Sequence, residues 1–410
     1  MCKHKIELLS PAGDMEKLEY AILFGADAVY LALKEFGMRA GTGNFEKDEL
    51  ITAVKKAHLN GVKVYVTCNI LPKNNHMDNI KEYLEVIKTA NVDALIVADI
   101  GVLAAVKKYL PNIAIHVSTQ AGIVNYAAAQ EFFNMGAKRV VLARELQLSD
   151  IQVIREKTDP SLEIEAFVHG AMCVSFSGRC LLSSYLTGRD ANRGECAQPC
   201  RWNYYLMEEK RPGQYFKICE DDAGTYILNA KDLCMIEYID KLAAAGINSF
   251  KIEGRAKSFY YVAMVTNAYK KAIELYYKNP DGYKVPSYLI QEVEKVSHRQ
   301  YSTGFYFGNP NNGQFYENGG YIRTCEVMAT VEKSDEKFIY CIQRNKFNVG
   351  ENLEIISPSK KAREILIESI WDENDVSITS VPHPMMKFKI PNTFGTKYEK
   401  GAIIRKNINA

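Results

Sequence analysis

The 410-residue chain carries 51 Lys and Arg residues against 49 Asp and Glu residues, a net charge of +2, and is 47% apolar and 24% charged. This composition is ordinary for a globular protein with a sizeable core, and it gives no support to a basic, nonspecific nucleic-acid-binding domain. No apolar run approaches the length of about 18 residues that a membrane span needs, and no signal peptide is visible after MCKHKIELLS. Ten cysteines without a secretion signal favour reduced thiols, so we expect a cytoplasmic protein that contacts no membrane.

Eight short apolar runs, rich in β-branched residues, alternate with amphipathic helical patterns along the first part of the chain. Most of these runs are continuously apolar, as strands are when both faces of a parallel sheet are buried. We expect strands at residues 6–9, 28–33, 63–69, 94–98, 114–118, 139–143, 163–168 and 249–252. Nearly every run is followed by a helical pattern. The alternation predicts an α/β fold, a (β/α)8 TIM-like barrel over residues 1–310.

A turn-rich segment, GNPNNGQFYENGG at 308–320, separates the barrel from a different pattern. Short alternating runs follow it at 322–331, 337–344, 352–356 and 375–381. Turn signals such as Asn348-Val349-Gly350-Glu351 divide them. We therefore expect a small C-terminal antiparallel β-barrel domain over residues 320–410.

Polar residues gather just beyond the expected barrel strands. In a TIM barrel the functional groups lie at the C-terminal ends of the strands, which share one face. Any one of these residues could be an ordinary loop polar or a helix cap, but their coincidence on one face favours a site. They are Ser10, Gly13, Asn69, Thr119, Gln120, Arg144, Glu145, His169, Lys251, Glu253 and Arg255.

Four cysteines follow the seventh expected strand with the spacing C-x6-C-x15-C-x3-C, in a polar insertion at about 170–217. Buried structural cysteines usually occur singly on the inner face of an element, so a cluster in a polar loop favours a shared ligand. Four thiolates suit a tetrahedral zinc ion or an iron–sulfur cluster, while redox thiols and inert cysteines remain alternatives. The four are Cys173, Cys180, Cys196 and Cys200.

Further motifs extend from this segment over nearly the whole chain. The residues of the cysteine segment that form a signature are Glu165, Phe167, His169, Gly170, Cys173, Gly178, Arg179, Cys180 and Ser183. Other motif residues lie at 9–14, 39–40, 44–45, 188–189, 193–194, 198–202, 229–233 and 249–255. Together they closely resemble the signature of the collagenase-like peptidase family, number thirty-two among the unclassified peptidases.

This resemblance implies a function that the family's name does not suggest. Its better-understood members look like oxygen-independent hydroxylases that carry a 4Fe–4S cluster, and they act on tRNA, on a ribosomal RNA cytidine or on ubiquinone precursors. The chain looks most similar to the tRNA hydroxylation branch, which makes 5-hydroxyuridine at the wobble position and depends on prephenate. The partners implied are tRNA and a small carboxylate metabolite, and the resemblance leaves a paralogous partner subunit open.

The resemblance also implies which cysteines would hold the cluster. They are Cys173, Cys180, Cys196 and Cys200, although some relatives in the quinone branch use a cysteine at the position of Cys234. Whether Cys234 replaces Cys200 stays open. Four thiolates would favour electron transfer or a structural role, whereas three would leave an iron open for the oxygen donor.

The chemistry of a dicarboxylate donor then suggests roles for the polar residues at the strand ends. Arginine is the preferred partner of carboxylates, so Arg144 and Arg255 are candidate substrate-binding residues. Lys251 is a candidate for the same clamp and for catalysis. Glu253 or His169 could transfer protons. Gln120 is a further candidate substrate-binding residue. For the RNA, we expect base stacking on the aromatic residues after the cysteines, Trp202, Tyr204 and Tyr205.

Two other classes of function compete with the hydroxylase. A collagenase-like peptidase would need a nucleophile and a base, but the chain has neither H-E-x-x-H nor G-x-S-x-G. Cys173 could pair with His169 as in a cysteine protease, which would leave the other three clustered cysteines without a role. The second alternative is a noncatalytic RNA-binding scaffold.

Overall fold

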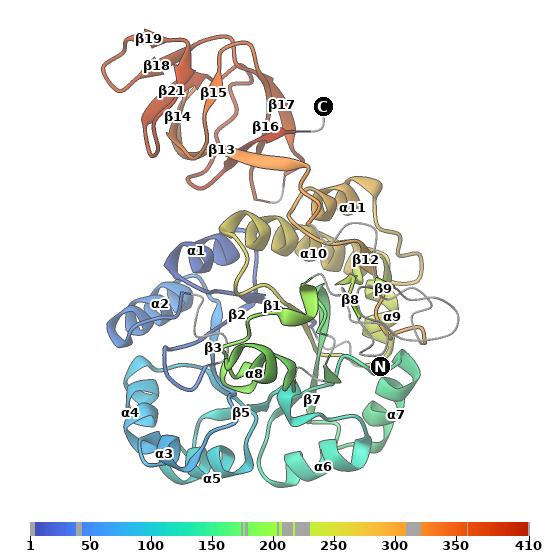
Figure 1. Ribbon diagram of the computed structural model, residues 1–410. Coiled ribbons are helices and arrows are strands. Elements are labelled where there is room, and N and C mark those ends of the chain that lie inside the picture. Colours follow the sequence, from blue (N-terminus) through green and yellow to red (C-terminus); the bar gives the residue numbers. More distant parts are fainter. Residues whose placement is uncertain are drawn as a thin grey trace.

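The computed structural model describes residues 5–37, 43–173, 175–176, 179–202, 205–206, 216–217, 230–308, 321–358 and 360–408. Figure 1 shows a barrel viewed down its axis, with a second, smaller unit beside α1, α10 and α11. The expected turn segment at 308–320 lies outside the described residues except for Gly308. None of the helices described is both long and apolar enough to cross a membrane.

Eight parallel strands close into the barrel, and this confirms the predicted TIM-like fold. Each strand pairs with its neighbour in chain order, and β11 closes the circle by pairing with both β1 and β7. The strands are β1 (Glu7–Pro11), β2 (Ala28–Leu31), β3 (Lys63–Cys68), β4 (Ala94–Val97), β5 (Ala114–Val117), β6 (Arg139–Val141), β7 (Glu163–Ala171) and β11 (Ser249–Ile252). Apolar residues from both faces of these strands are buried, as the continuous apolar runs predicted.

Helices surround the barrel on its outside (Figure 1). They begin at residues suited to capping: the Asp14 carboxylate accepts a hydrogen bond from Lys17 N, and the Asp99 carboxylate accepts one from Val102 N. The helices are α1 (Met15–Leu23), α2 (Lys47–Leu59), α3 (Asn74–Met77), α4 (Ile80–Ala90), α5 (Ile100–Tyr109), α6 (Tyr126–Asn134), α7 (Leu148–Lys157), α9 (Ile239–Ala244), α10 (Phe259–Lys278) and α11 (Ser287–Glu294).

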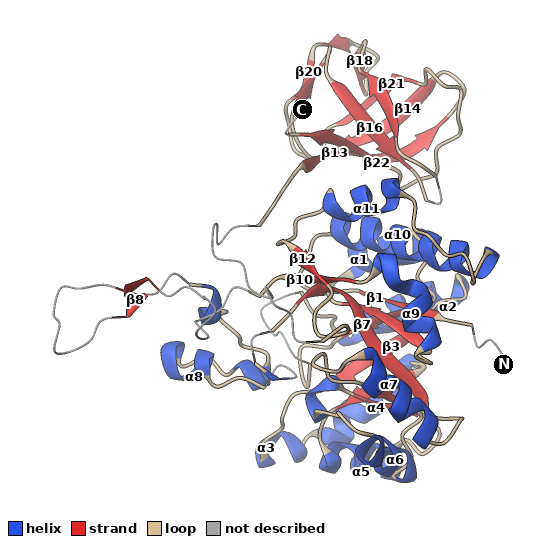
Figure 2. Cartoon of the chain, turned by 90° about the vertical axis from the view of Figure 1, so that its right-hand side faces the viewer, coloured by secondary structure: helices blue, strands red, loops and turns tan. Residues whose placement is uncertain are grey.

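The segment between β7 and β11 adds elements at one end of the barrel. A short helix, α8 (Leu182–Thr187), projects over the barrel in Figure 1 and lies beyond its end in Figure 2. The strands β8 (Tyr205–Leu206) and β9 (Phe216–Lys217) form a small antiparallel ribbon. The last residues of β7 pair with β10 (Asp232–Cys234), which pairs in turn with β12 (Tyr301–Ser302).

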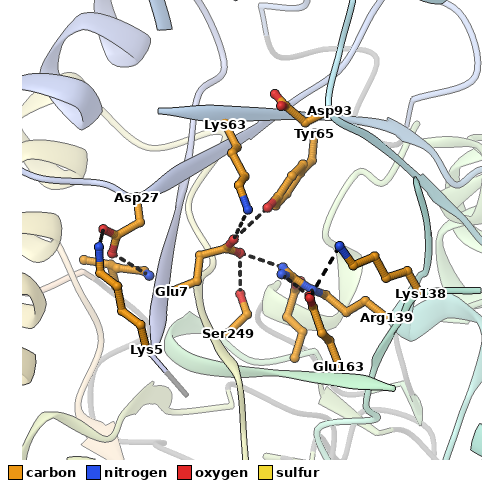
Figure 3. A network of polar contacts seen from close by, with 12 residues as sticks. Lys5, Glu7, Asp27, Lys63, Tyr65, Asp93, Lys138, Arg139, Glu163 and Ser249 are labelled. Atoms are coloured by element: carbon orange, nitrogen blue, oxygen red, sulfur yellow. Dashed lines mark hydrogen bonds and ion pairs between the residues drawn. The ribbon is translucent and has the colours of Figure 1, made fainter. Parts of the chain in front are cut away.

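A network of charged and polar residues with the buried Arg139 among them lies at the other end of the barrel (Figure 3). Arg139 is 3% exposed, and its guanidinium lies 2.6 Å from a carboxylate oxygen of Glu7, 2.6 Å from one of Glu163 and 3.0 Å from one of Glu165. Burial raises the pKa of Glu7, but the charge and hydrogen bonds of Arg139 outweigh it, so the pKa is lowered overall. One buried cation therefore pairs with three carboxylates from two strands and stabilises this end of the barrel.

Replacing Arg139 with Met should destabilise the barrel by about 3–5 kcal/mol, because buried carboxylates would lose their cation. Since the pKa of Glu7 is lowered in the fold, its contribution is present above the carboxyl's ordinary pKa and is lost as the pH falls through the lowered one. The difference between wild type and variant should therefore shrink in acid. Urea unfolding at several pH values measures this. The control is Arg363→Met at an exposed arginine of the C-terminal domain; equal stabilities of the two variants would contradict the prediction.

The second unit is an antiparallel sheet of eight strands, curled into a half-barrel, and this confirms the predicted class. The sheet contains β13 (Cys325–Ser334), β14 (Phe338–Gln343), β16 (Asn352–Ile356), β17 (Arg363–Leu366), β18 (Ile370–Asp372), β19 (Ser377–Ile378), β21 (Lys387–Pro391) and β22 (Ile403–Asn407). The run expected at 375–381 is divided between β19 and β20 (Ser380–Val381), and β20 pairs with β15 (Phe347–Asn348) in a separate ribbon. The patterns at 363–366, 370–372, 387–391 and 403–407 were not anticipated.

Buried ion pairs connect the two units. Arg405 of β22 is 0% exposed, and its guanidinium lies 2.7 Å from a carboxylate oxygen of Glu292 in α11. It also contacts Glu354 of β16 at 2.7 Å and the hydroxyl of Tyr260 in α10 at 3.0 Å. Because one buried arginine bonds to groups from both units, the C-terminal domain is held at a defined position against α10 and α11.

Candidate functional site

A cavity of about 1080 Å³ opens at the C-terminal ends of the barrel strands. Its inner wall includes side chains of the strands themselves, such as Tyr30 of β2, Thr67 of β3 and Phe167 of β7. Residues just beyond the strands, the cysteine segment and part of the C-terminal domain form the remainder. This is the face on which a TIM barrel carries its functional groups.

The cavity brings together nine of the eleven residues proposed from the sequence as site residues. All nine line it, although they come from four separate regions of the chain. They are Gln120, Arg144, Cys173, Cys180, Cys196, Cys200, Lys251, Glu253 and Arg255. His169 and Trp202 are not among the lining residues.

Lys251 lies on β11 inside the barrel and is 5% exposed. Its Nζ donates a hydrogen bond of 2.8 Å to the Glu165 carboxylate, and it lies 4.5 Å from the centre of the Tyr30 ring. Glu165 also accepts from Arg139, so the network at the far end of the barrel reaches the floor of the cavity. Lys251 is thus a buried cation in a fixed position, suited to binding an anion.

Arg144 and Glu253 form an ion pair at the cavity wall, with 2.9 Å between Nη2 and Oε2. Arg144 follows β6 and Glu253 follows β11. The second Arg144 nitrogen, Nη1, donates to the carbonyl of Ala171 at 2.8 Å, and the guanidinium lies 3.8 Å from the centre of the Phe167 ring. Three contacts therefore hold Arg144 in one orientation, which lowers the entropy cost of binding a carboxylate.

Arg255 is 3% exposed and lines the cavity next to β3, where its Nη1 donates to the Thr67 hydroxyl at 3.2 Å. Its backbone packs so closely on the loop after β1 that a Cβ at Gly13 would lie 2.3 Å from the Arg255 carbonyl oxygen. The motif glycine at this position therefore allows the chain to bring Arg255 to the cavity.

Gly170 performs the same function for Glu253. Its φ is +109°, and a Cβ there would lie 2.3 Å from the Glu253 carbonyl oxygen. We expect Gly170→Ala to cost at least about 2 kcal/mol more than Gly61→Ala, because Gly61 has φ +70° but nothing within 4 Å of a Cβ. Denaturant unfolding of both variants measures the difference. Equal losses would mean that the contact with Glu253 has no cost.

Gln120 contributes an unusual acceptor to the wall. Its side chain is 6% exposed, and among the described residues no donor lies within hydrogen-bond distance of its Oε1. Its backbone is fixed, because the Ser118 hydroxyl accepts from Gln120 N at 3.3 Å and the Gln120 carbonyl accepts from Arg179 Nε at 2.7 Å. A buried acceptor in this position suits a ligand that carries an N–H or O–H group.

The four clustered cysteines are free thiols that line the same cavity. Burial of the sulfur raises the pKa of the Cys173 thiol, although the Ser175 N–H and the charge of Arg144 lower it in part. Backbone N–H groups of Ser175 and Gln198 lie 3.4 Å and 3.3 Å from the sulfurs of Cys173 and Cys196. Such N–H···S bonds stabilise thiolate ligands of iron–sulfur clusters, so the donor set fits this kind of group. Within the described residues, no three His, Cys, Asp or Glu side chains already converge on a metal position.

Of the remaining cysteines that the structure describes, Cys325 alone lines the cavity. Cys234 does not line the cavity: it pairs with His169 across β10 and β7, and burial raises the pKa of its thiol to about 12. Cys68 and Cys341 are buried in the two cores. Cys325 borders the cavity, although the sequence did not single it out. Cys2 and Cys219 lie outside the described residues.

His169, expected to transfer protons, is buried behind the cavity wall and is 1% exposed. Its two ring nitrogens lie 3.4 Å and 3.3 Å from the hydroxyls of Tyr269 and Tyr301. Burial, together with the charges of His298 and Lys257, lowers its pKa to about 3. A neutral imidazole held by two tyrosines is a packing residue in this arrangement, so the geometry favours Glu253 as the proton carrier.

The structure describes only some of the aromatic residues expected for base stacking. Trp202 is 49% exposed and lies outside the cavity, and Tyr204 lies outside the described residues. The aromatic groups that do line the cavity include Tyr30, Phe167 and Tyr321. These three were not predicted as lining residues, because a single aromatic residue in the sequence resembles an ordinary core residue.

The fold and the cavity define a class: a TIM-like barrel with cysteines at its C-terminal mouth and an appended antiparallel β domain. Within this class the chain matches the model of peptidase family U32 over residues 13–315. It also matches the model of the peptidase family U32 C-terminal domain over residues 323–405. The chain belongs to peptidase family U32.

Three similar proteins carry two kinds of name. The chain is 39% identical over 391 residues to tRNA hydroxylation protein P1 of Bacillus subtilis, covering 94% of this chain and 92% of the relative. It is 36% identical over 397 residues to tRNA hydroxylation protein P of Escherichia coli, covering 86% of each. A Methanocaldococcus jannaschii protein named as an uncharacterized protease is 41% identical over 385 residues, covering 91% of this chain and 92% of the relative.

Proposed function

We propose that this chain is an RNA hydroxylase that forms 5-hydroxyuridine at the wobble position of a subset of tRNAs, with a prephenate-type carboxylate as co-substrate. The names of the Bacillus subtilis and Escherichia coli relatives support a role in tRNA hydroxylation. The observation that carries the proposal is that four thiols and buried cations line the same cavity.

The cations of the cavity are suited to bind a small carboxylate through ion pairs and hydrogen bonds. Lys251 is fixed by Glu165, Arg144 by Glu253, and Arg255 lies against Thr67. The three cations come from two strand ends, those of β6 and β11, and line one cavity, so a ligand with two carboxylates could contact more than one of them. Glu253 is the carboxylate in position to accept or return a proton during hydroxylation.

The proposed cofactor is a 4Fe–4S cluster held by Cys173, Cys180, Cys196 and Cys200. Bound there, it would supply electron transfer next to the carboxylate-binding chamber. The protein's own contribution would be to desolvate the reactants, to orient the co-substrate through its cations and to donate N–H groups to the sulfurs of Cys173 and Cys196.

The peptidase alternative has support from the name of the Methanocaldococcus jannaschii relative. It requires a base beside the Cys173 thiol, and the expected base was His169. His169 is held between Tyr269 and Tyr301 behind the wall, with a pKa of about 3, so it is poorly suited to activate a nucleophile in the cavity. The geometry therefore favours hydroxylation over proteolysis.

Nucleoside analysis of tRNA tests the proposal. The chain is expressed in a bacterial deletion strain whose tRNA lacks 5-hydroxyuridine derivatives. Wild type should restore them and Cys173→Ser should not, whereas Cys341→Ser, which changes a buried cysteine of the C-terminal domain, should behave as wild type. Restoration by Cys173→Ser would favour a noncatalytic scaffold. Unchanged tRNA with a newly hydroxylated ribosomal cytidine would move the substrate to the ribosome.

A further inference from the structure

The cavity at the barrel mouth does not end with the barrel. Part of its outer wall comes from the C-terminal domain and from the residues that lead into it, a region that no strand-end pattern indicated. The residues that line it from this side are Tyr321, Arg323, Cys325, Glu326, Val327, Arg344 and Asn345. A ligand that fills the cavity would therefore contact both units.

The lining is strongly cationic although the whole chain has a net charge of only +2. Three acidic residues line the cavity, namely Glu145, Glu253 and Glu326. Seven basic residues line it: Arg144, Arg189, Lys251, Arg255, Lys257, Arg323 and Arg344. Low-dielectric walls concentrate such a field, so the cavity attracts a ligand with more negative charge than one small carboxylate supplies.

Three of these cations line the outer part of the cavity, away from the barrel interior. They are Lys257, Arg323 and Arg344, and we call them the cationic wall. Arg323 is exposed, and among the described residues it has no ion pair with a carboxylate. The Nζ of Lys257 donates to the carbonyl of Ser297 at 2.9 Å and lies 4.0 Å from the centre of the Tyr321 ring. The charge of Arg323 is thus available to a ligand.

The wall is held rigidly against the barrel. Arg344 follows β14, and its Nη2 lies 2.6 Å from a carboxylate oxygen of Glu16 in α1. Its guanidinium also lies 5.1 Å from the centre of the Phe259 ring in α10. Backbone N–H groups of Arg344 and Asn345 donate to the carbonyl of Met328 in β13, a few residues from Arg323. The buried Arg405 pairs add a second anchor, so the wall keeps its position without a ligand.

We propose that the cationic wall binds the sugar–phosphate backbone of the RNA strand whose target base enters the barrel mouth. The inference rests on the proposed function, in which the substrate is RNA. A base that reacts inside a barrel must leave its stack, and its flanking phosphates then remain at the rim. Cations at the rim suit phosphates, while the acceptor of Gln120 and the inner cations suit the base and the co-substrate. The C-terminal domain would thereby act as part of the substrate-binding site.

Salt-dependent binding of a tRNA anticodon stem-loop with a wobble uridine tests the wall. Arg323→Gln and Lys257→Gln should each weaken binding at low salt by at least about threefold. Each should also flatten the plot of log Kd against log salt concentration by about 0.7, the value for one lost phosphate contact on single-stranded nucleic acid. The matched control is Arg363→Gln, an exposed arginine of the same domain that does not line the cavity. Thermal unfolding of each variant verifies the fold.

The possible outcomes separate the wall from the proposed function. If wild type binds the stem-loop and both variants keep the salt slope of Arg363→Gln, the cationic wall does not bind the RNA backbone. The proposal that RNA is the substrate would be unaffected. If wild type binds a poly-glutamate peptide more tightly than the stem-loop, the wall belongs to a protein partner and the inference is overturned. If wild type binds neither, the inference and the proposed function fail together.

Discussion

Replacing Cys200 with Ser should reduce the iron content of anaerobically purified protein from about four per chain to well below that value, because a four-cysteine cluster would lose one ligand. Replacing Cys234 with Ser should leave the iron content unchanged. Cys200 lines the cavity with the other three thiols, whereas Cys234 is paired with His169 across two strands and does not line it. Iron and sulfide analysis, with the visible absorption spectrum, measures both variants without any assay of activity.

The paired variants also decide between two ligand sets. If Cys200→Ser retains four irons and Cys234→Ser loses iron, then Cys234, and not Cys200, is the fourth ligand. One tightly bound zinc ion and no iron in wild type would make the site a structural zinc centre with four thiolates.

Replacing Arg255 with Met should lower kcat/KM for the carboxylate co-substrate by about 100-fold to 1000-fold, the effect of removing one partner of a buried, charged contact. The guanidinium is 3% exposed and lines the chamber beside Thr67. Arg255→Lys should fall between wild type and Arg255→Met, because lysine keeps the charge but loses the planar pair of donors.

Steady-state kinetics with varied co-substrate measures the effect, and Arg363→Met is the control that removes an arginine far from the cavity. A rise in KM with little change in kcat would mean that Arg255 binds ground state and transition state equally. If the kinetics of Arg255→Met equal those of wild type, Arg255 does not contribute to binding the co-substrate.

The barrel could be predicted from the sequence because its strands are buried on both faces. Such strands read as continuous apolar runs, and all eight were found at the expected positions. The C-terminal domain was predicted less completely, and β22 shows why. It contains Arg405, whose burial depends on carboxylates of Glu292 and Glu354 that are distant in sequence. A charged residue in the middle of a short run argues against a buried strand until those partners are known.

Part of the candidate site could be predicted from one rule, which places the functional residues of a TIM barrel at the C-terminal ends of its strands. Residues beyond strand ends share a face, and this rule brought Arg144, Glu253 and Arg255 to one cavity. His169 obeys the same rule in sequence, but Tyr269 and Tyr301 cover it from α10 and β12. Arg323 and Arg344 of the cationic wall were missed for the opposite reason, because they come from a second domain whose orientation the local pattern does not determine.

The most direct test of the account is hydroxylation by the purified protein. Anaerobically reconstituted protein is incubated with tRNA from a strain that lacks 5-hydroxyuridine, a reductant, and prephenate, and the nucleosides are then analysed by mass spectrometry. The proposed function predicts 5-hydroxyuridine at the wobble position in the complete mixture, and none with Cys173→Ser or without the carboxylate. Cleavage of denatured collagen by wild type, with no change in the tRNA, would contradict the proposed function.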